Sequence, residues 1–368
     1  MEIEEKEVAS KTNISLDYKF LIDKAIYWQF IKYSALDKII EKEYKNSNSD
    51  KINIYIDLYQ ILATICRFTQ MKNIYSISSG IINYCAHLRR YFRKIDVYAN
   101  IALIYNDGSM NTIKQFIPEF NSIYNARIES NKRIKNAFNK NLELLKLLVP
   151  YLPNIYLRCG TTDSAIMIYD MVKRKLMGIA PTLVISNSQY MYQLPQLLTS
   201  VRVIRKVGTA KGDDNTYSYN HNNCMEAYMY GTRLRNVMCN FNQNTLSTLM
   251  TLNGVPKLGI KTMGYNYLTA IDICNSIPIG YEHDVDTVAN TFIMFNEKHN
   301  KNKRKSRPTV DIFVNRFKGM DLIYQYSLYK LLPEYNELDF LKNLEDKESV
   351  HSINSVYYSE CQLDLEGL

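Results

Sequence analysis

Three aspartates stand where carboxylates could act together. Asp57 ends the apolar run of residues 52–56, Asp107 ends a second such run, and Asp163 follows a third. If these runs are parallel strands, their carboxyl ends meet at one edge of a sheet, where functional residues gather. Converging carboxylates repel one another unless they share divalent cations, and such oxygen ligands suit Mg²⁺ or Mn²⁺. Two ions about 4 Å apart would polarise a phosphodiester and generate hydroxide for in-line attack.

Each aspartate also has a simpler explanation. Asp57 and Asp163 stand where helix caps are expected, since a helix is expected to follow each of them. The pair Asp107-Gly108 is common in turns. The residues alone leave both interpretations open.

Two groups of residues could contact phosphate. The first follows Asp107 in a basic, helix-like stretch, and the second surrounds a glycine-containing turn whose backbone N–H groups could bind a phosphate at a helix start. The first group is Lys114, Arg127, Lys132 and Arg133, and the second is Lys257, Gly259, Lys261 and Gly264. A solvated helix face would explain the first group equally well. The net charge of +8 permits contact with nucleic acid but is too small to require it.

The cysteines and histidines indicate neither a disulfide framework nor a zinc site. Seven cysteines are scattered singly, which is typical of reduced thiols in a long chain. The nearest approach to a metal pattern is His221-x-x-Cys224, and no second pair accompanies it.

The elements that would position these residues alternate between strand and helix. Strands are expected at 51–57, 98–106, 154–158 and 181–186, with helices at 15–46, 58–70, 75–92, 110–148 and 162–176 and another opening at 192. This alternation predicts an α/β fold, with a mostly parallel sheet covered by helices on both faces. Residues 208–222 are expected to form a polar loop, and beyond about residue 235 short helices replace the strands.

Four regions are expected along the chain. They are an N-terminal helical extension (1–50), the α/β domain (51–235), a helical region with a basic linker (236–330) and an acidic C-terminal tail (331–368). The linker is the basic run 298–307. The sequence contains no run of eighteen or more uncharged apolar residues, so no membrane-spanning segment is expected.

Five segments, in order, resemble the metal-dependent 5′-nuclease family, the PIN-like group that includes flap endonucleases. They are INIYIDLYQIL, ALIYNDGS, RCGTTDSAIMIYDMV, TLVISNSQYMYQLPQLL and LSTLMTLNGVPKLGIKTMGYNYLTAIDI, covering roughly residues 50–275. The resemblance implies that Asp57, Asp107 and Asp163 bind Mg²⁺. It also implies that the last segment is a helix–three-turn–helix unit meeting duplex backbone.

The chain departs from this family at acidic positions. Neutral residues stand where the family has carboxylates, namely Thr161, Ser164, Ser188, Tyr190 and Val255. Because anionic ligands supply much of a site's affinity for divalent cations, the second metal position is expected to be dismantled.

Three functions follow as expectations. The first is a degenerate 5′-nuclease-like protein, inactive or weakly active, that serves as a structural or nucleic-acid-binding component of a phage or virus. The second is an active Mg²⁺-dependent 5′-nuclease acting on branched or free-ended DNA. The third is an oligomeric interaction protein, since tyrosine, present thirty times here, is enriched at interfaces. The expected location is the host cytoplasm or the virion, and the expected partners are DNA, virion proteins or further copies of the chain, with no membrane.

Overall fold

The computed structural model describes most of the central part of the chain. The described residues are 40–41, 44, 49–58, 74–106, 113–117, 132–186, 188–206, 216–224, 228, 242–255, 260–299 and 309–335. Asp107, Arg127, Lys257 and Gly259, among the residues singled out from the sequence, lie outside this set. Residues 59–70 of the expected helix 58–70 and most of the N-terminal extension also lie outside it.

A six-stranded sheet forms the centre of the molecule, in the order β3-β2-β1-β4-β5-β6. The strands are β1 (Lys51–Asp57), β2 (Tyr98–Asn106), β3 (Ile155–Gly160), β4 (Thr182–Ile185), β5 (Val201–Lys206) and β6 (Thr216–Tyr219). The first five are parallel, and β6 runs antiparallel to β5 at the edge. The chain moves from β1 outward to β3 and then returns to place β4 on the other side of β1. The topological switch point therefore lies between β1 and β4.

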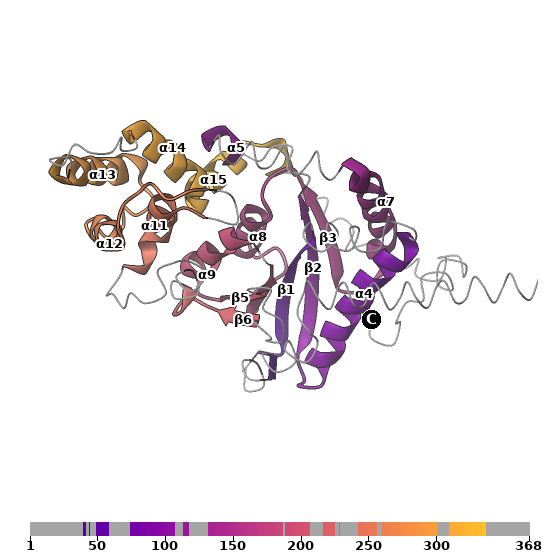
Figure 1. Ribbon diagram of the computed structural model, residues 1–368. Helices are drawn as coiled ribbons and strands as arrows, with labels where there is room; N and C mark the ends of the chain where they lie inside the picture. The colour runs from indigo at the N-terminus through magenta and orange to yellow at the C-terminus, as the bar shows by residue number, and fades with distance from the viewer. Residues whose placement is uncertain are drawn as a thin grey trace, which may run out of the picture.

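Helices cover both faces of the sheet (Figure 1). On one face lie α4 (Ile74–Arg93) and α7 (Lys132–Leu148), and on the other lie α8 (Ser164–Lys173) and α9 (Gln193–Leu197). Because side chains alternate along β1, this strand packs against the helices on both faces of the sheet. Ile52, Ile54 and Ile56 pack toward α4 and α7, while Tyr55 packs toward α8. A parallel strand buried on both faces is mostly apolar, and the run of residues 52–56 has only Asn53 as an exception, which is why it predicts a strand.

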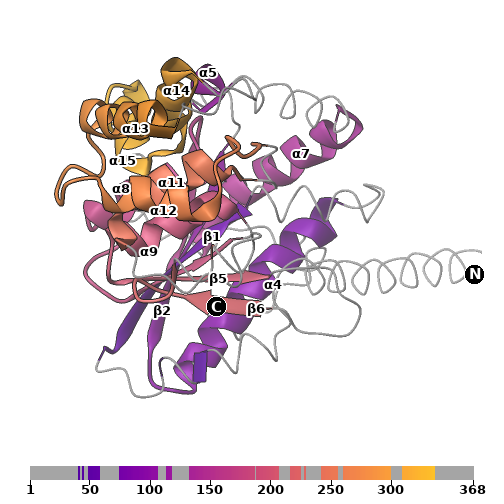
Figure 2. The same ribbon diagram turned by 60° about the vertical axis from the view of Figure 1, so that its left-hand side comes forward.

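The remaining helices gather beyond α8 and α9 at one end of the molecule (Figures 1 and 2). They are α5 (Ile113–Phe116), α11 (Leu246–Asn253), α12 (Tyr267–Asn275), α13 (Val285–His299), α14 (Val310–Met320) and α15 (Leu322–Tyr329). Stacked rings of Phe292 and Phe313, with centroids 4.0 Å apart, join α13 to α14. Tyr326 of α15 meets Tyr169 of α8 edge to face at 4.9 Å, which ties this group to the sheet layer.

The fold class predicted from the sequence is confirmed: an α/β fold with a mostly parallel sheet and helices on both faces. The strand list was incomplete, however. β5 was not predicted, and β6 lies inside the expected loop 208–222. Residues 216–219 do show the alternation of a strand, since Tyr217 and Tyr219 alternate with Thr216 and Ser218. The polar residues on both sides of this short segment favoured the prediction of a loop. Pairing with β5 buries Tyr219 and stabilises a four-residue strand that would not hold alone.

No helix among the described residues is long and apolar enough to cross a membrane.

Candidate functional site

Asp57 lies at the switch point of the sheet. It is the last residue of β1, it is buried, and it is on the same face as Tyr55. Ser186 follows the neighbouring strand β4 directly, and its hydroxyl donates to Asp57 Oδ2 at 2.8 Å. The Ser186 oxygen in turn accepts the backbone N–H of Ser188 at 3.1 Å. A chain of neutral groups therefore covers one oxygen of this carboxylate.

Asp163 caps the first turn of α8. Its backbone is extended (φ −64°, ψ 141°), and its side chain accepts the N–H of Ala165 at 2.9 Å. Burial raises the pKa of Asp163 to about 6, and the hydrogen bond from Ala165 opposes this rise. The simpler role considered from the sequence, a helix cap, is therefore present in the structure.

Asp57 and Asp163 belong to elements that meet at the carboxyl edge of the sheet. Asp57 pairs in register with Ile104 of β2, and Ile104 pairs with Arg158 of β3. At the level of Asp57, β3 is thus two strand spacings from β1, about 10 Å. Asp163 follows β3 in the sequence, and its charge acts on Tyr190, which follows β4. Asp107 follows β2 in the sequence and lies outside the described residues.

The neutral residues that the resemblance aligns with carboxylates take part in other contacts. The Thr161 N–H and hydroxyl both donate to Oε2 of Glu334, each at 2.8 Å. An acidic residue at 161 would repel that carboxylate. Ser164 is buried in the first turn of α8 and Val255 is fully buried. Ser188 bonds the N–H of Tyr190 through its side chain at 3.2 Å.

Tyr190 lies at the carboxyl edge of the sheet, near Asp163. It is buried, and its hydroxyl donates to the carbonyl of Gly319 at 3.5 Å. Burial raises the pKa of Tyr190 well above its ordinary value, and the charges of Asp163 and Asp321 act in the same direction. This side chain joins the sheet layer to the helices beyond it and offers no anionic ligand.

The described residues do not fit a two-cation site. Among them, no group of three or more histidine, cysteine, aspartate or glutamate side chains lies close enough to hold a metal ion. Asp57 hydrogen-bonds a serine, and Asp163 bonds its own helix. Divalent cations of the Mg²⁺ class depend on several converging anionic oxygens, and Tyr190 and Val255 cannot supply them.

The second candidate site is the connection between α11 and α12. Gly254 ends α11 with φ +73°, and a Cβ there would lie 2.4 Å from the carbonyl oxygen of Ile260. Val255 and Ile260 then pair as a short antiparallel bridge. Lys261 is exposed beside this bridge, and its carbonyl accepts the guanidinium of Arg316 at 2.7 Å. The described ends of this turn are therefore held together by the bridge, and Lys261 is exposed beside it.

Gly264 completes the connection. It has φ +83°, which favours glycine, and Asn266 then caps α12 by accepting the N–H of Thr269 at 2.8 Å. Of the other predicted phosphate contacts, Lys114 lies in α5 and Lys132 and Arg133 begin α7. Of these helices, α5 packs on α14 and α7 packs on α4.

Several residues that organise the site carried no sequence signal. Gln193, His283, Asp321 and Glu334 make buried or partly buried polar contacts over long sequence separations. Single polar residues in loops show no periodicity, and only the folded chain reveals their partners. Glu334 also belongs to the segment predicted as an acidic tail, so the beginning of that segment packs on the sheet layer.

No protein-family model matches this chain, and no curated protein matches it. Among solved structures, it is similar to the bacteriophage T5 flap endonuclease in a pseudo-enzyme–product complex with DNA and metal ions. That likeness has 12% identity, covers 81% of this chain and 98% of the other, and has a TM-score of 0.47. Two further T5 structures, one co-crystallised with metal ions and one a 5′-exonuclease with zinc bound, have 12% and 11% identity and TM-scores of 0.46 and 0.42. They cover 82% and 85% of this chain, and 99% and 97% of theirs. The likeness concerns the nuclease-like fold and assigns no activity or ligand to this chain.

Proposed function

We propose that this chain binds nucleic acid through a nuclease-like α/β fold and that its metal-dependent cleavage is absent or very weak. The observation that most supports binding is the α11–α12 connection. Its backbone is shaped by Gly254 and Gly264, both with positive φ, and it carries exposed Lys261 ahead of the Asn266 cap of α12. Backbone N–H groups and a lysine in that setting suit a phosphate.

Weak or absent cleavage is the second part of the proposal. The Ser186 hydroxyl bonds Asp57, and the buried ring of Tyr190 lies where the resemblance implies a carboxylate. Binding to phosphates needs cations and backbone N–H groups, whereas two-metal cleavage needs converging anions. The α11–α12 connection offers an exposed lysine and backbone N–H groups, which supports binding. Among the described residues no three acidic, histidine or cysteine side chains converge, which supports weak or absent cleavage.

Titrating duplex DNA at increasing salt tests the binding proposal. We expect weak binding without sequence preference and an affinity that falls steeply with salt, because each neutralised phosphate releases counterions. The double variant K257Q/K261Q should reduce the slope of log affinity against log salt by about one to two units.

The matched control is K51Q/K94Q. It removes the same charge, but Lys51 begins β1 and Lys94 follows α4, so both exposed lysines lie toward the opposite edge of the sheet. The control should keep the slope of the unmodified chain. A chain that fails to bind duplex DNA even at low salt would contradict the proposal and favour the oligomeric, scaffold-like role, which a solution mass measurement would then examine.

A further inference from the structure

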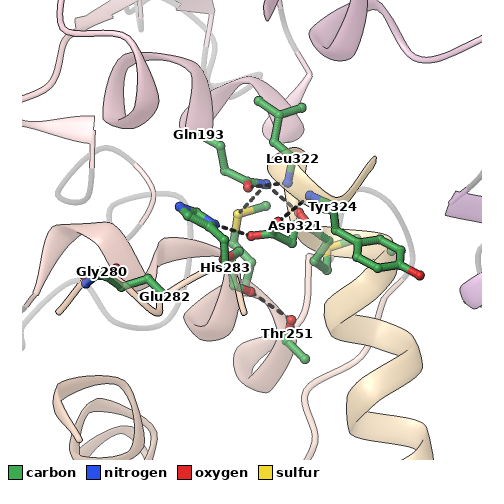
Figure 3. Close-up of polar contacts among 12 residues, drawn as sticks. Gln193, Thr251, Gly280, Glu282, His283, Asp321, Leu322 and Tyr324 are labelled. Carbon is green, nitrogen blue, oxygen red and sulfur yellow. Dashed lines mark hydrogen bonds and ion pairs between the residues drawn. The ribbon is translucent and has the colours of Figure 1, made fainter. Parts of the chain in front are cut away.

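The junction between α14 and α15 is where three parts of the molecule meet (Figure 3). Met320 ends α14, Asp321 caps the next helix, and Leu322 begins α15. Gln193 reaches this junction from α9 in the sheet layer, and His283 reaches it from the connection between α12 and α13. A change at this point would therefore act on both groups of helices.

Gln193 forms the permanent part of this contact. Its buried amide donates to the Met320 carbonyl at 2.7 Å and accepts the Leu322 N–H at 3.0 Å. Both ends of the amide are used, so it bonds the backbone on either side of Asp321. Neither group titrates, so this attachment does not change with pH.

The contact between His283 and Asp321 is different because it can gain or lose a charge. Asp321 is fully buried, and its Oδ1 accepts the Tyr324 N–H at 2.7 Å, which caps α15. Its Oδ2 lies 2.6 Å from Nδ1 of His283, whose side chain is 24% exposed. Among the described residues, His283 is the cationic group that pairs with this carboxylate. A buried carboxylate whose partner becomes neutral loses compensation for its desolvation.

The charged surroundings favour the protonated ring. Burial alone would lower the pKa of His283, but the hydrogen bond and charge of Asp321, helped by Glu282, outweigh it and raise the pKa above its ordinary value. The nearby groups from α9 and α11 are the neutral Gln193 and Met250, and Tyr190 stays protonated. Asp284, at the start of α13, directs its carboxylate to the Thr287 N–H instead.

We propose that His283 and Asp321 form a pH-sensitive clasp that fastens the connection between α12 and α13 to the α14–α15 junction. The clasp is closed when the ring is protonated. Deprotonation leaves Nδ1–H able to donate, but it removes the charge that balances Asp321. The connection is then held from its other side, where Glu282 bonds the Gly280 N–H at 2.7 Å and Asn242 at 3.4 Å.

The direction of the pH effect follows from the raised pKa. A histidine whose pKa is higher in the folded chain contributes stability that is fully present below about pH 6.5 and is lost as the pH rises through the folded value. The clasp therefore loosens as the pH rises through that folded value. The uncompensated charge of Asp321 acts in the same direction, because its cost appears only once the ring of His283 is neutral.

Thermal unfolding of the full chain between about pH 5.5 and about pH 8.5 tests the clasp. The variant H283Q keeps an N–H donor but cannot be charged. We expect its unfolding midpoint to lie a few degrees below that of the unmodified chain at the acidic end, with the difference shrinking toward the alkaline end. D321N, which keeps the cap of α15 because asparagine also caps helices, should flatten the profile in the same way, and the double variant should add nothing further.

The control is H221Q, because the His221 ring contacts a backbone carbonyl, that of Pro195, at 3.2 Å. It should keep the pH profile of the unmodified chain. The ring of His283 can also be followed directly by NMR, and its titration midpoint should fall in D321N. An H283Q profile parallel to that of the unmodified chain, or a His283 titration unaffected by D321N, would overturn the proposal.

Discussion

At the scale of single residues, neutral side chains surround Asp57 at the carboxyl edge of the sheet. The Ser186 hydroxyl bonds Asp57, and Tyr190 fills the neighbouring space with a ring that also reaches Gly319. Asp57 Oδ2 and the Tyr190 hydroxyl therefore each have a hydrogen-bond partner within the chain.

Asp163 allows its role as a cap to be separated from a role as an anion. Replacing it by alanine removes the bond to the Ala165 N–H, whereas asparagine keeps a cap and removes only the charge. We expect D163A to lower the free energy of unfolding by about 1 kcal/mol relative to D163N, measured by denaturant unfolding at neutral pH.

D163N should itself be at least as stable as the unmodified chain at neutral pH. In the unmodified chain the pKa of Asp163 is raised to about 6, so above that pH the folded chain bears the cost of a desolvated charge, which D163N lacks. This cost vanishes as the pH falls through 6 toward the ordinary value of about 4. Equal stability of D163A and D163N would contradict the assignment of Asp163 as a cap.

At the scale of elements, the C-terminal half of α8 is bound to α15 and β3 through Asp170. Asp170, fully buried on α8, lies 3.6 Å from Arg158 and 3.4 Å from Arg174, and it accepts the Tyr326 hydroxyl at 3.2 Å. Arg158 also donates to the Tyr329 hydroxyl at 2.6 Å. Burial raises the pKa of Asp170 while both arginines oppose the rise. Removing one partner of such a group leaves a buried charge uncompensated.

The α11–α12 connection is the element whose shape depends most on glycine. A Cβ at Gly254 would meet backbone atoms of Ile260 and Lys261 at 2.4–2.7 Å, and φ is +73°. We expect G254A to lower the free energy of unfolding by about 3 kcal/mol or more and to weaken DNA binding.

The matched control for that prediction is G264A. Gly264 has φ +83°, but nothing lies within 4 Å of its added Cβ, so only the strain of the left-handed backbone applies, about 1 kcal/mol. Denaturant unfolding compares the two variants. Equal losses of stability in G254A and G264A would show that the close backbone approach at Gly254 adds no cost beyond the strain of the left-handed backbone.

At the scale of the whole molecule, the helices beyond α8 and α9 are joined to the sheet layer by buried polar contacts as well as by apolar packing. Gln193, Tyr190 and Arg158 each cross that boundary. One apolar core extends from Tyr55 of the sheet through α8 to Phe313 and Phe317 of α14. The candidate phosphate-contact turn is thus carried on a body fixed to the sheet.

Cleavage assays examine the molecule as a possible enzyme. We expect no measurable cleavage, or very little, of flap, nicked or single-stranded DNA with Mg²⁺ or Mn²⁺, because the described part of the chain lacks the converging anions of a two-metal site. Asp57→Asn is the decisive variant, and its control is Asp50→Asn, which changes the residue just before the start of β1. Metal-dependent cleavage that is lost in Asp57→Asn and kept in Asp50→Asn would support the active-nuclease alternative instead.

The sequence by itself determined the elements that depend on local pattern. The apolar runs ending at Asp57 and Asn106 predicted β1 and β2, and the order of strands and helices predicted the parallel sheet, because burial on both faces requires continuous apolar residues. The resemblance also implied that neutral residues stand at acidic positions of the nuclease family. Only the tertiary structure decided what those residues contact. Thr161 bonds Glu334 and Tyr190 reaches Gly319 across long sequence separations, and His283 pairs with Asp321 in the same way. No local periodicity records such pairs, since a hydrogen bond between distant loops depends on how the whole chain packs.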